Sequence, residues 1–262
     1  MCGAGWRCGL PTSSDAALRC EGLGKSYRLG EELSLQHTLR TLVGRAGQPD
    51  RLWALRDVTF EVERGSFFGI VGSNGSGKST LTQLISSIAV PDEGSVHIRG
   101  RVLPLLEVGN GFHEDLTGRE NVELLGTVLG LSAAEVIAEL PRIVESAGVE
   151  RHLETPLKRY SSGMQARLSF ATAVCFPADI YVFDEVLAVV DDDFRDRCVA
   201  ELRELNESGR TVIFMSHDLP LVATLCSSGM WLEQGQVRHV GEMDEVARRY
   251  AASHQGPVGE TA

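Results

Sequence analysis

Basic residues are scarce in this chain of 262 residues. Lysine and arginine together number 25 against 36 aspartates and glutamates, so the formal net charge at pH 7 is -11. Nucleic acids and anionic lipid surfaces both attract positively charged proteins. The charge balance therefore argues against a general nucleic-acid-binding protein and against docking onto a lipid surface by charge. It leaves docking onto a membrane protein open.

Long apolar runs are also missing. No stretch approaches the roughly 20 residues needed to span a bilayer. The first seven residues lack the apolar core of a secretion signal. The sequence therefore predicts a protein that stays in the cytosol.

The six cysteines lack the spacing of a metal site. None forms a C-x-x-C pair and no histidine cluster accompanies them, which argues against bound zinc. Cys175 and Cys198 lie in runs with helical character. We expect both to be small core residues in a reducing compartment.

The most informative stretch that is present runs from residue 72 to residue 80. An apolar run with strand character precedes it, and a run with helical character follows it. A strand, the pattern G-x-x-x-x-G-K-[ST] and a helix form the context of a phosphate-binding P-loop. Glycines let successive N–H groups point at phosphate oxygens, and the helix adds the positive end of its dipole. The residues expected to bind nucleotide here are Gly72, Ser73, Asn74, Gly75, Ser76, Gly77, Lys78, Ser79 and Thr80.

Two side chains carry the expected chemistry of this loop. Lys78 would reach the β- and γ-phosphates, and the Ser79 hydroxyl would ligate Mg²⁺. The competing interpretation is a Gly/Ser-rich surface turn. The strand before the loop and the helix after it favour the P-loop.

Strands and helices alternate through the rest of the chain, which predicts an α/β fold with a mainly parallel core. Residues 1–17 are expected to form a flexible arm, 18–252 one nucleotide-binding domain, and 253–262 a disordered tail. Helices within about 107–176 would form an inserted helical lobe. The expected strands lie at 18–23, 53–62, 67–71, 95–98, 102–106, 180–183 and 211–215, with a hairpin at 230–240. The expected helices lie at 34–43, 81–85, 117–131, 132–147, 164–176, 191–208, 218–226 and 242–252.

Two carboxylates follow the apolar strand at 180–183. An acid at the end of a strand beside the P-loop can hold Mg²⁺, directly or through water, which is the expected role of Asp184. Glu185, one residue on, can polarise a water that attacks the γ-phosphate. Without a P-loop upstream, two solvated carboxylates after a core strand would be the better interpretation.

Polar groups recur at two further element ends. His217 follows the buried strand at 211–215, and a histidine there can bond to the γ-phosphate. Ser161 and Gly163 lie where a helix opens, and a helix start offers N–H donors to phosphate. Read alone, His217 is a structural histidine and residues 161–163 are an ordinary capped helix start.

The order of these motifs resembles that of the ATP-binding subunits of ABC transporters, over residues 18–250. Residues 160–164 correspond to the signature motif of that family, usually spelled Leu-Ser-Gly-Gly-Gln. Ser161 and Gly163 match it, whereas Tyr160, Ser162 and Met164 depart from it. This spelling looks like the branch that exports lipid-linked polysaccharides such as O-antigen, capsule and wall teichoic acid. Residues 105–112, 116–121 and 184–189 also look like that branch.

The resemblance implies an ABC ATPase fold: a mainly parallel core sheet, an antiparallel β portion and an inserted helical lobe. It implies ATP and Mg²⁺ as ligands. Tyr27 would stack on adenine, with Trp53 as its rival. Asp191 matches the Asp of the loop after Glu185, and Glu107 lies nearest the family's usual metal-binding Gln.

The resemblance also implies partners. Two copies of the chain would pair head to tail, each closing Ser161 and Gly163 over ATP held by Lys78 and Ser79 of the other. A membrane permease subunit would touch the helical lobe around residues 107–130 and would itself contact the glycan. The chain would be a peripheral protein on the cytoplasmic face of the membrane, in a short form without a C-terminal sugar-binding domain.

Three other functions compete with this one. A soluble ABC ATPase acting on ribosomes or DNA would usually carry two cassettes or a coiled coil and a basic surface. An importer or a drug or lipid exporter is opposed only by the branch-like spellings. A small-molecule P-loop kinase is opposed by the helix start at 161–163 and by His217.

Overall fold

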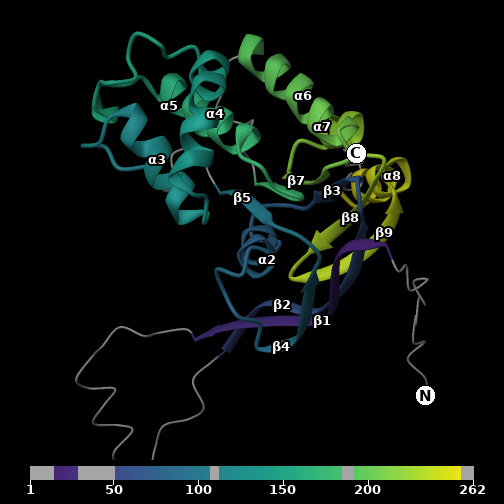
Figure 1. Ribbon diagram of the computed structural model, residues 1–262. Coiled ribbons are helices and arrows are strands. Elements are labelled where there is room, and N and C mark those ends of the chain that lie inside the picture. Colours follow the sequence, from purple (N-terminus) through teal and green to yellow (C-terminus); the bar gives the residue numbers. More distant parts are fainter. Residues whose placement is uncertain (1–14, 29–50, 107–111, 185–191, 255–262) are drawn as a thin grey trace, which may run out of the picture.

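The computed structural model describes residues 15–28, 51–106, 112–184 and 192–254 (Figure 1). These residues form two sheets with helices around them. The helix expected at 34–43 lies outside the described residues.

The larger sheet has six strands in the order β5-β6-β7-β3-β8-β9. All neighbours from β5 to β8 are parallel, and only β9 is antiparallel, to β8. Every residue of β3, β6 and β7 is buried, as expected for strands covered on both faces. The mainly parallel core is therefore confirmed. Its strands are β3 (Phe67–Val71), β5 (Val102–Leu106), β6 (Ile180–Asp184), β7 (Thr211–Ser216), β8 (Ser228–Glu233) and β9 (Gln236–Glu242).

The smaller sheet is antiparallel, in the order β2-β1-β4. It consists of β1 (Ala16–Arg28), β2 (Arg51–Glu63) and β4 (Glu93–Ile98). The flexible arm was predicted to reach residue 17, and this is wrong at its end: Ala16 and Ala17 are buried and belong to β1, because Ala16 pairs with Glu63 of β2. β1 also runs past residue 23, although the register shifts around Gly22 and Gly24. Pairing with β2 on one side and β4 on the other sustains the strand where the sequence pattern breaks.

The helices follow the predicted order. They are α2 (Lys78–Ile85), α3 (Gly118–Val128), α4 (Ala133–Ala147), α5 (Ser162–Cys175), α6 (Asp192–Glu207), α7 (Leu219–Leu225) and α8 (Met243–His254). Thr117 and Ser132 form capping boxes at the starts of α3 and α4, and Gly148 ends α4 in the left-handed conformation. The tail was predicted to begin at 253, but α8 continues to His254, where the ring packs on Tyr250.

The larger sheet separates two apolar cores. Alternate residues of each strand point to opposite faces. Phe183 and Phe214 join the core beneath α3 to α8, whereas Val182 and Ile213 join the core around α2 and the smaller sheet. Figure 1 shows α2 between the two sheets and α3, α4 and α5 on the other side of the larger sheet. The carboxyl ends of the parallel strands thus lie between two well-packed layers.

Cys175 and Cys198 are buried, as predicted, and so are Cys20 and Cys226. Burial raises the pKa of the Cys20 thiol to about 12 and that of Cys175 to about 11, so both are protonated at neutral pH. Among the described residues there is no cluster of three or more His, Cys, Asp or Glu able to hold a metal ion. Within the same residues, every helix is too short or too polar to cross a bilayer.

Asn121 ties the start of the helical lobe to α3. This fully buried amide donates from Nδ2 to the carbonyls of His113, Leu116 and Thr117, at 3.0, 3.1 and 2.9 Å, and its Oδ1 accepts from His113 N. Asn121→Ala leaves these buried groups without their partner. We expect a loss of about 1–3 kcal/mol in the free energy of unfolding, measured with urea.

Glu123→Ala, an exposed change on the same helix, serves as the control and should stay within about 0.5 kcal/mol of wild type. Equal unfolding midpoints for the two variants would show that the Asn121 network does not stabilise the lobe.

Candidate functional site

The P-loop joins β3 to α2 and is packed tightly against two neighbouring strands. A side chain at Gly72 would clash with the carbonyl of Leu232 in β8. Gly77 has a φ of 106°, and a Cβ there would lie 2.7 Å from the carbonyl of Ala54 in β2. Since only glycine combines this backbone with this proximity, the curvature of the loop depends on both residues.

Lys78 begins α2 and is almost completely buried. Its Nζ donates to the carbonyls of Gly72 at 2.8 Å and Ser73 at 3.2 Å, which holds the ammonium across the loop. The Ser76 hydroxyl is also buried, without a hydrogen-bond partner among the described residues. A buried positive charge and a buried hydroxyl without a partner at the start of a helix suit a bound phosphate group.

A cavity of about 640 Å³ opens over the loop. Its walls come from three segments of chain: β2, the P-loop with the start of α2, and the turn between β8 and β9. The lining residues are Leu52, Trp53, Ala54, Asn74, Gly75, Gly77, Lys78, Ser79, Thr80 and Gln234. This volume is within the range of small-molecule sites.

Trp53, and not Tyr27, belongs to this lining. Across the strands Trp53 pairs with Ser26 and Tyr27 pairs with Leu52. The Tyr27 hydroxyl instead lies 3.4 Å from Gln83 Oε1 of α2, and its ring is partly exposed. The aromatic side chain beside the P-loop is therefore that of Trp53, the alternative to Tyr27.

Asp184 ends β6 and is buried. In the sheet, β7 lies between β6 and the P-loop strand β3. α2 closes this gap, because Thr82 Oγ1 lies 3.3 Å from Asp184 Oδ2. Thr82 was not predicted from the sequence as a site residue. Its spacing, one turn after Lys78, places it on the face of α2 that meets the sheet. Asp184 is thereby held one helical turn from Ser79.

His217 follows β7, which pairs directly with β3, and its side chain is exposed. The next residue, Asp218, is fixed from three sides: its N–H donates to Ser216 Oγ at 3.0 Å, and its carboxylate accepts from Leu221 N and pairs with Arg195 of α6. Arg195 had no sequence signal, since the pair joins residues 23 positions apart. The loop that carries His217 is thus held to both α6 and α7.

Ser161 and Gly163 open α5, as predicted. The Ser161 hydroxyl accepts from Met164 N at 3.2 Å and caps the helix. Among the described residues, a Cβ at Gly163 would meet only Ser161 Oγ, at 3.9 Å, so packing within this part of the chain does not require glycine there. α5 packs on the face of the larger sheet opposite α2, and neither residue lines the P-loop cavity.

Three expected site residues, Glu107, Glu185 and Asp191, lie outside the described residues. Glu185 directly follows Asp184 in the chain, and Asp191 directly precedes α6.

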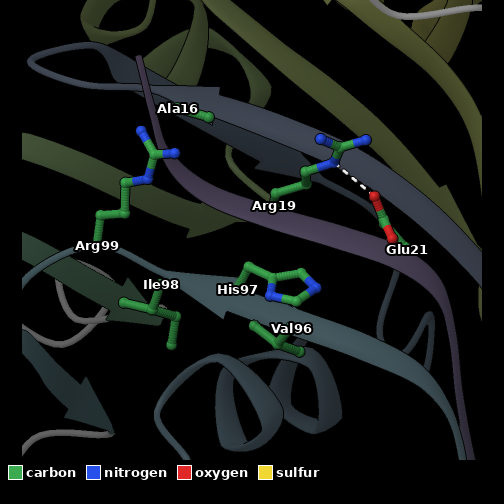
Figure 2. Close-up of a pocket in the computed structure, with 7 residues that line it drawn as sticks. All are labelled: Ala16, Arg19, Glu21, Val96, His97, Ile98 and Arg99. Carbon is green, nitrogen blue, oxygen red and sulfur yellow. Dashed lines mark ion pairs between the residues drawn. The ribbon is translucent and has the colours of Figure 1, made fainter. Parts of the chain in front are cut away.

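A second hollow, of about 620 Å³, lies on β1 and β4 (Figure 2). It carries basic side chains, but Arg19 Nε is paired with Glu21 Oε1 at 2.6 Å and with Glu61 Oε1 at 3.1 Å. His97 Nε2 lies 3.1 Å from Ser95 Oγ. Because carboxylates offset the charge of Arg19, the cavity over the P-loop remains the candidate site.

Comparisons with known proteins show the family to which the chain belongs. Residues 55–188 match the family model described as ABC transporter. The teichoic acids export ATP-binding protein TagH of Bacillus cereus (strain ZK / E33L) is 41% identical over 200 residues, covering 76% of this chain and 36% of that protein. The O-antigen export system ATP-binding protein RfbB of Klebsiella pneumoniae is 39% identical over 197 residues, covering 75% of this chain and 80% of that protein.

RfbB of Myxococcus xanthus is 37% identical over 248 residues, which cover 92% of this chain and 56% of that protein. The chain spans 36%, 38% and 56% of the length of the first three curated relatives it matches. Among solved structures, a dimeric post-hydrolysis state of the ATP-binding cassette MJ0796 with ADP and Pi superposes with a TM-score of 0.71. That match is 23% identical and covers 86% of this chain and 98% of that one, and it confirms the fold.

Gly75 and Gly77 form a matched pair for testing the packing of the loop. Both have positive φ, but a Cβ at Gly75 meets open space whereas one at Gly77 meets the Ala54 carbonyl. Gly75→Ala should cost only backbone strain, about 1–2 kcal/mol of unfolding free energy. Gly77→Ala should cost about 1–3 kcal/mol more, because strand β2 must shift. Urea unfolding of the two variants measures the difference, and equal losses would contradict the packing described.

Proposed function

The chain belongs to the ABC transporter family, and from this premise we propose that it is the ATP-binding and ATP-hydrolysing subunit of a glycan exporter. The glycan would be a lipid-linked polymer of the O-antigen or teichoic acid type, since relatives named for the export of such polymers are 37–41% identical to this chain. The observation that carries the catalytic part is the P-loop cavity, with Asp184 held beside it by Thr82.

ATP would lie along the cavity with its phosphates on the P-loop. Lys78 supplies the charge for the β- and γ-phosphates, and the N–H groups of the loop and of the first turn of α2 supply donors. The base would stack on Trp53, the aromatic side chain of the lining, which would contribute about 0.5–1.5 kcal/mol.

The residues beside the P-loop also suit Mg²⁺, which prefers hydroxyl, carboxylate and phosphate oxygens. Ser79 and Asp184 would hold it, with Glu107 as a further candidate ligand. When bound, the ion would neutralise charge on the phosphates. Thr82 keeps the Asp184 carboxylate in place by its contact with Oδ2.

Hydrolysis needs a group that orients water and a group that detects the γ-phosphate. We assign the first role to Glu185, next to Asp184 in the chain, and the second to His217 at the end of β7. The pairing of Asp218 with Arg195 supports the second role, because it fixes the loop that carries His217.

The remaining wall of the site would come from a second copy of the chain. Ser161 and Gly163 lie in the helical lobe, on the opposite face of the sheet from α2. Packing among the described residues does not require glycine at position 163. A glycine there would allow a phosphate group held by the partner subunit to approach the backbone closely. Asp191, before α6, would lie at the same interface. The cassette MJ0796, of similar fold, forms a dimer, which supports this arrangement.

ATP would then act as a bridge between two subunits, because it binds the closed pair better than the open one. A membrane permease subunit docked around residues 107–130 would convert closure and reopening into glycan movement. The chain would work at the cytoplasmic face of the membrane as a peripheral subunit, with the permease contacting the glycan.

Lys78→Ala tests nucleotide binding. Loss of a charged hydrogen-bond donor to phosphate should weaken ATP binding about 10- to 150-fold, as measured by calorimetry. Lys158→Ala removes a lysine that pairs with Asp115 in the helical lobe and should leave the Kd unchanged. Unchanged binding in Lys78→Ala would refute the P-loop assignment.

Glu185→Gln tests hydrolysis and export together. The variant should bind ATP with wild-type affinity, hydrolyse it at least a hundredfold more slowly and accumulate as a dimer on size-exclusion chromatography. In cells that lack the wild-type chain, it should leave lipid-linked glycan on the cytoplasmic side of the membrane. A wild-type rate of ATP hydrolysis in this variant would show that Glu185 does not orient the attacking water. Normal glycan export by an inactive ATPase would refute the transport function.

A further inference from the structure

The turn between β8 and β9 has an unexpected residue in it. Two residues, Gln234 and Gly235, connect the strands, since Glu233 pairs with Gln236. Both have positive φ, 49° and 73°, as a type I′ turn requires. Asn, Asp or Gly is preferred at the first position, because other residues are strained there. The turn itself therefore gives no reason for a glutamine.

The turn is fixed against both walls of the P-loop cavity. Gly235 N donates to Ser76 O of the P-loop at 2.9 Å, and Arg56 N of β2 donates to Gly235 O at 2.9 Å. A side chain at Gly235 would clash with the Ala54 carbonyl, so the backbones are in direct contact. Gln234 thus projects from a rigid support, and it lines the cavity over the P-loop.

The position of the turn indicates which part of a ligand it faces. Trp53 marks the base end of the cavity and Lys78 the β- and γ-phosphate end. Gly235 lies beside residues between these ends: a Cβ on Gly77 would be 3.6 Å from Gly235 Cα and 2.7 Å from the Ala54 carbonyl. Gln234 leaves the turn here and belongs to the cavity lining. An amide offers a donor and an acceptor, which fit sugar hydroxyls and an α-phosphate oxygen.

We propose that Gln234 binds the sugar and α-phosphate part of the nucleotide, and that backbone strain is retained at this turn for that purpose. This role rests on the proposed ATP site, and it adds a third segment of the chain to that site. Because the contact avoids the base, it strengthens the binding of any nucleoside di- or triphosphate to the same degree.

Gln234→Asn and Gln234→Gly separate binding from folding. Both place a favoured turn residue at 234, so the ligand-free variants should melt at the wild-type temperature or above it. Neither retains an amide of the same reach. Calorimetry should show the affinities for ADP, ATP and GTP reduced by the same factor, about three- to tenfold. Binding of pyrophosphate, which has no sugar, should be unchanged.

Gln236→Asn, an exposed change at the start of β9 outside the cavity lining, is the matched control and should bind ADP like wild type. Wild-type affinity in both Gln234 variants would overturn the role of Gln234 alone. A loss for ATP but not GTP would overturn it as well, since it would mean a contact to the base. A wild-type chain that binds no nucleotide would overturn the proposed function itself.

Discussion

The carbonyl of Ala54 occupies the space that side chains at Gly77 and Gly235 would need. Three segments far apart in the sequence therefore meet backbone to backbone: strand β2, the P-loop and the β8–β9 turn. The hydrogen bonds Gly235 N to Ser76 O and Arg56 N to Gly235 O hold them together. The curvature of the P-loop depends on this contact as well as on the glycines of the loop. The P-loop, β2 and the β8–β9 turn therefore cannot move independently of one another.

Around this contact, sheet order decides which polar groups meet. β7 pairs directly with β3, so His217 follows the strand end beside the start of the P-loop. β6 is one strand further away, and Asp184 is linked to α2 through Thr82. A strand order with β6 beside β3 would have needed no such threonine. The position of His217 thus follows from strand pairing within the sheet, whereas that of Asp184 depends on a side-chain contact with a helix packed on the sheet.

Much of this was predictable because the signals are local. The buried runs of β3, β6 and β7, the capping boxes at Thr117 and Ser132 and the P-loop pattern all depend on neighbours within a few residues. That Trp53 lines the cavity was not predictable, because it depends on the pairing of β1 with β2, and which aromatic side chain stacks on a base stays a prediction. The contact of Gln234 with the cavity joins residues about 160 positions from the P-loop, and no local pattern encodes it. The roles of Glu107, Glu185 and Asp191 stay predictions.

The helical lobe has no core of its own. Phe170 of α5 packs on Phe183 of β6 and on Phe194 of α6, with ring centroids 6.0 Å apart in both contacts, and its neighbours continue into the core beneath the larger sheet. A lobe built in this way cannot swing freely on its two connections, because opening a gap would expose aromatic surface to water. The contacts of Phe170 therefore oppose a hinge opening between α5 and the larger sheet.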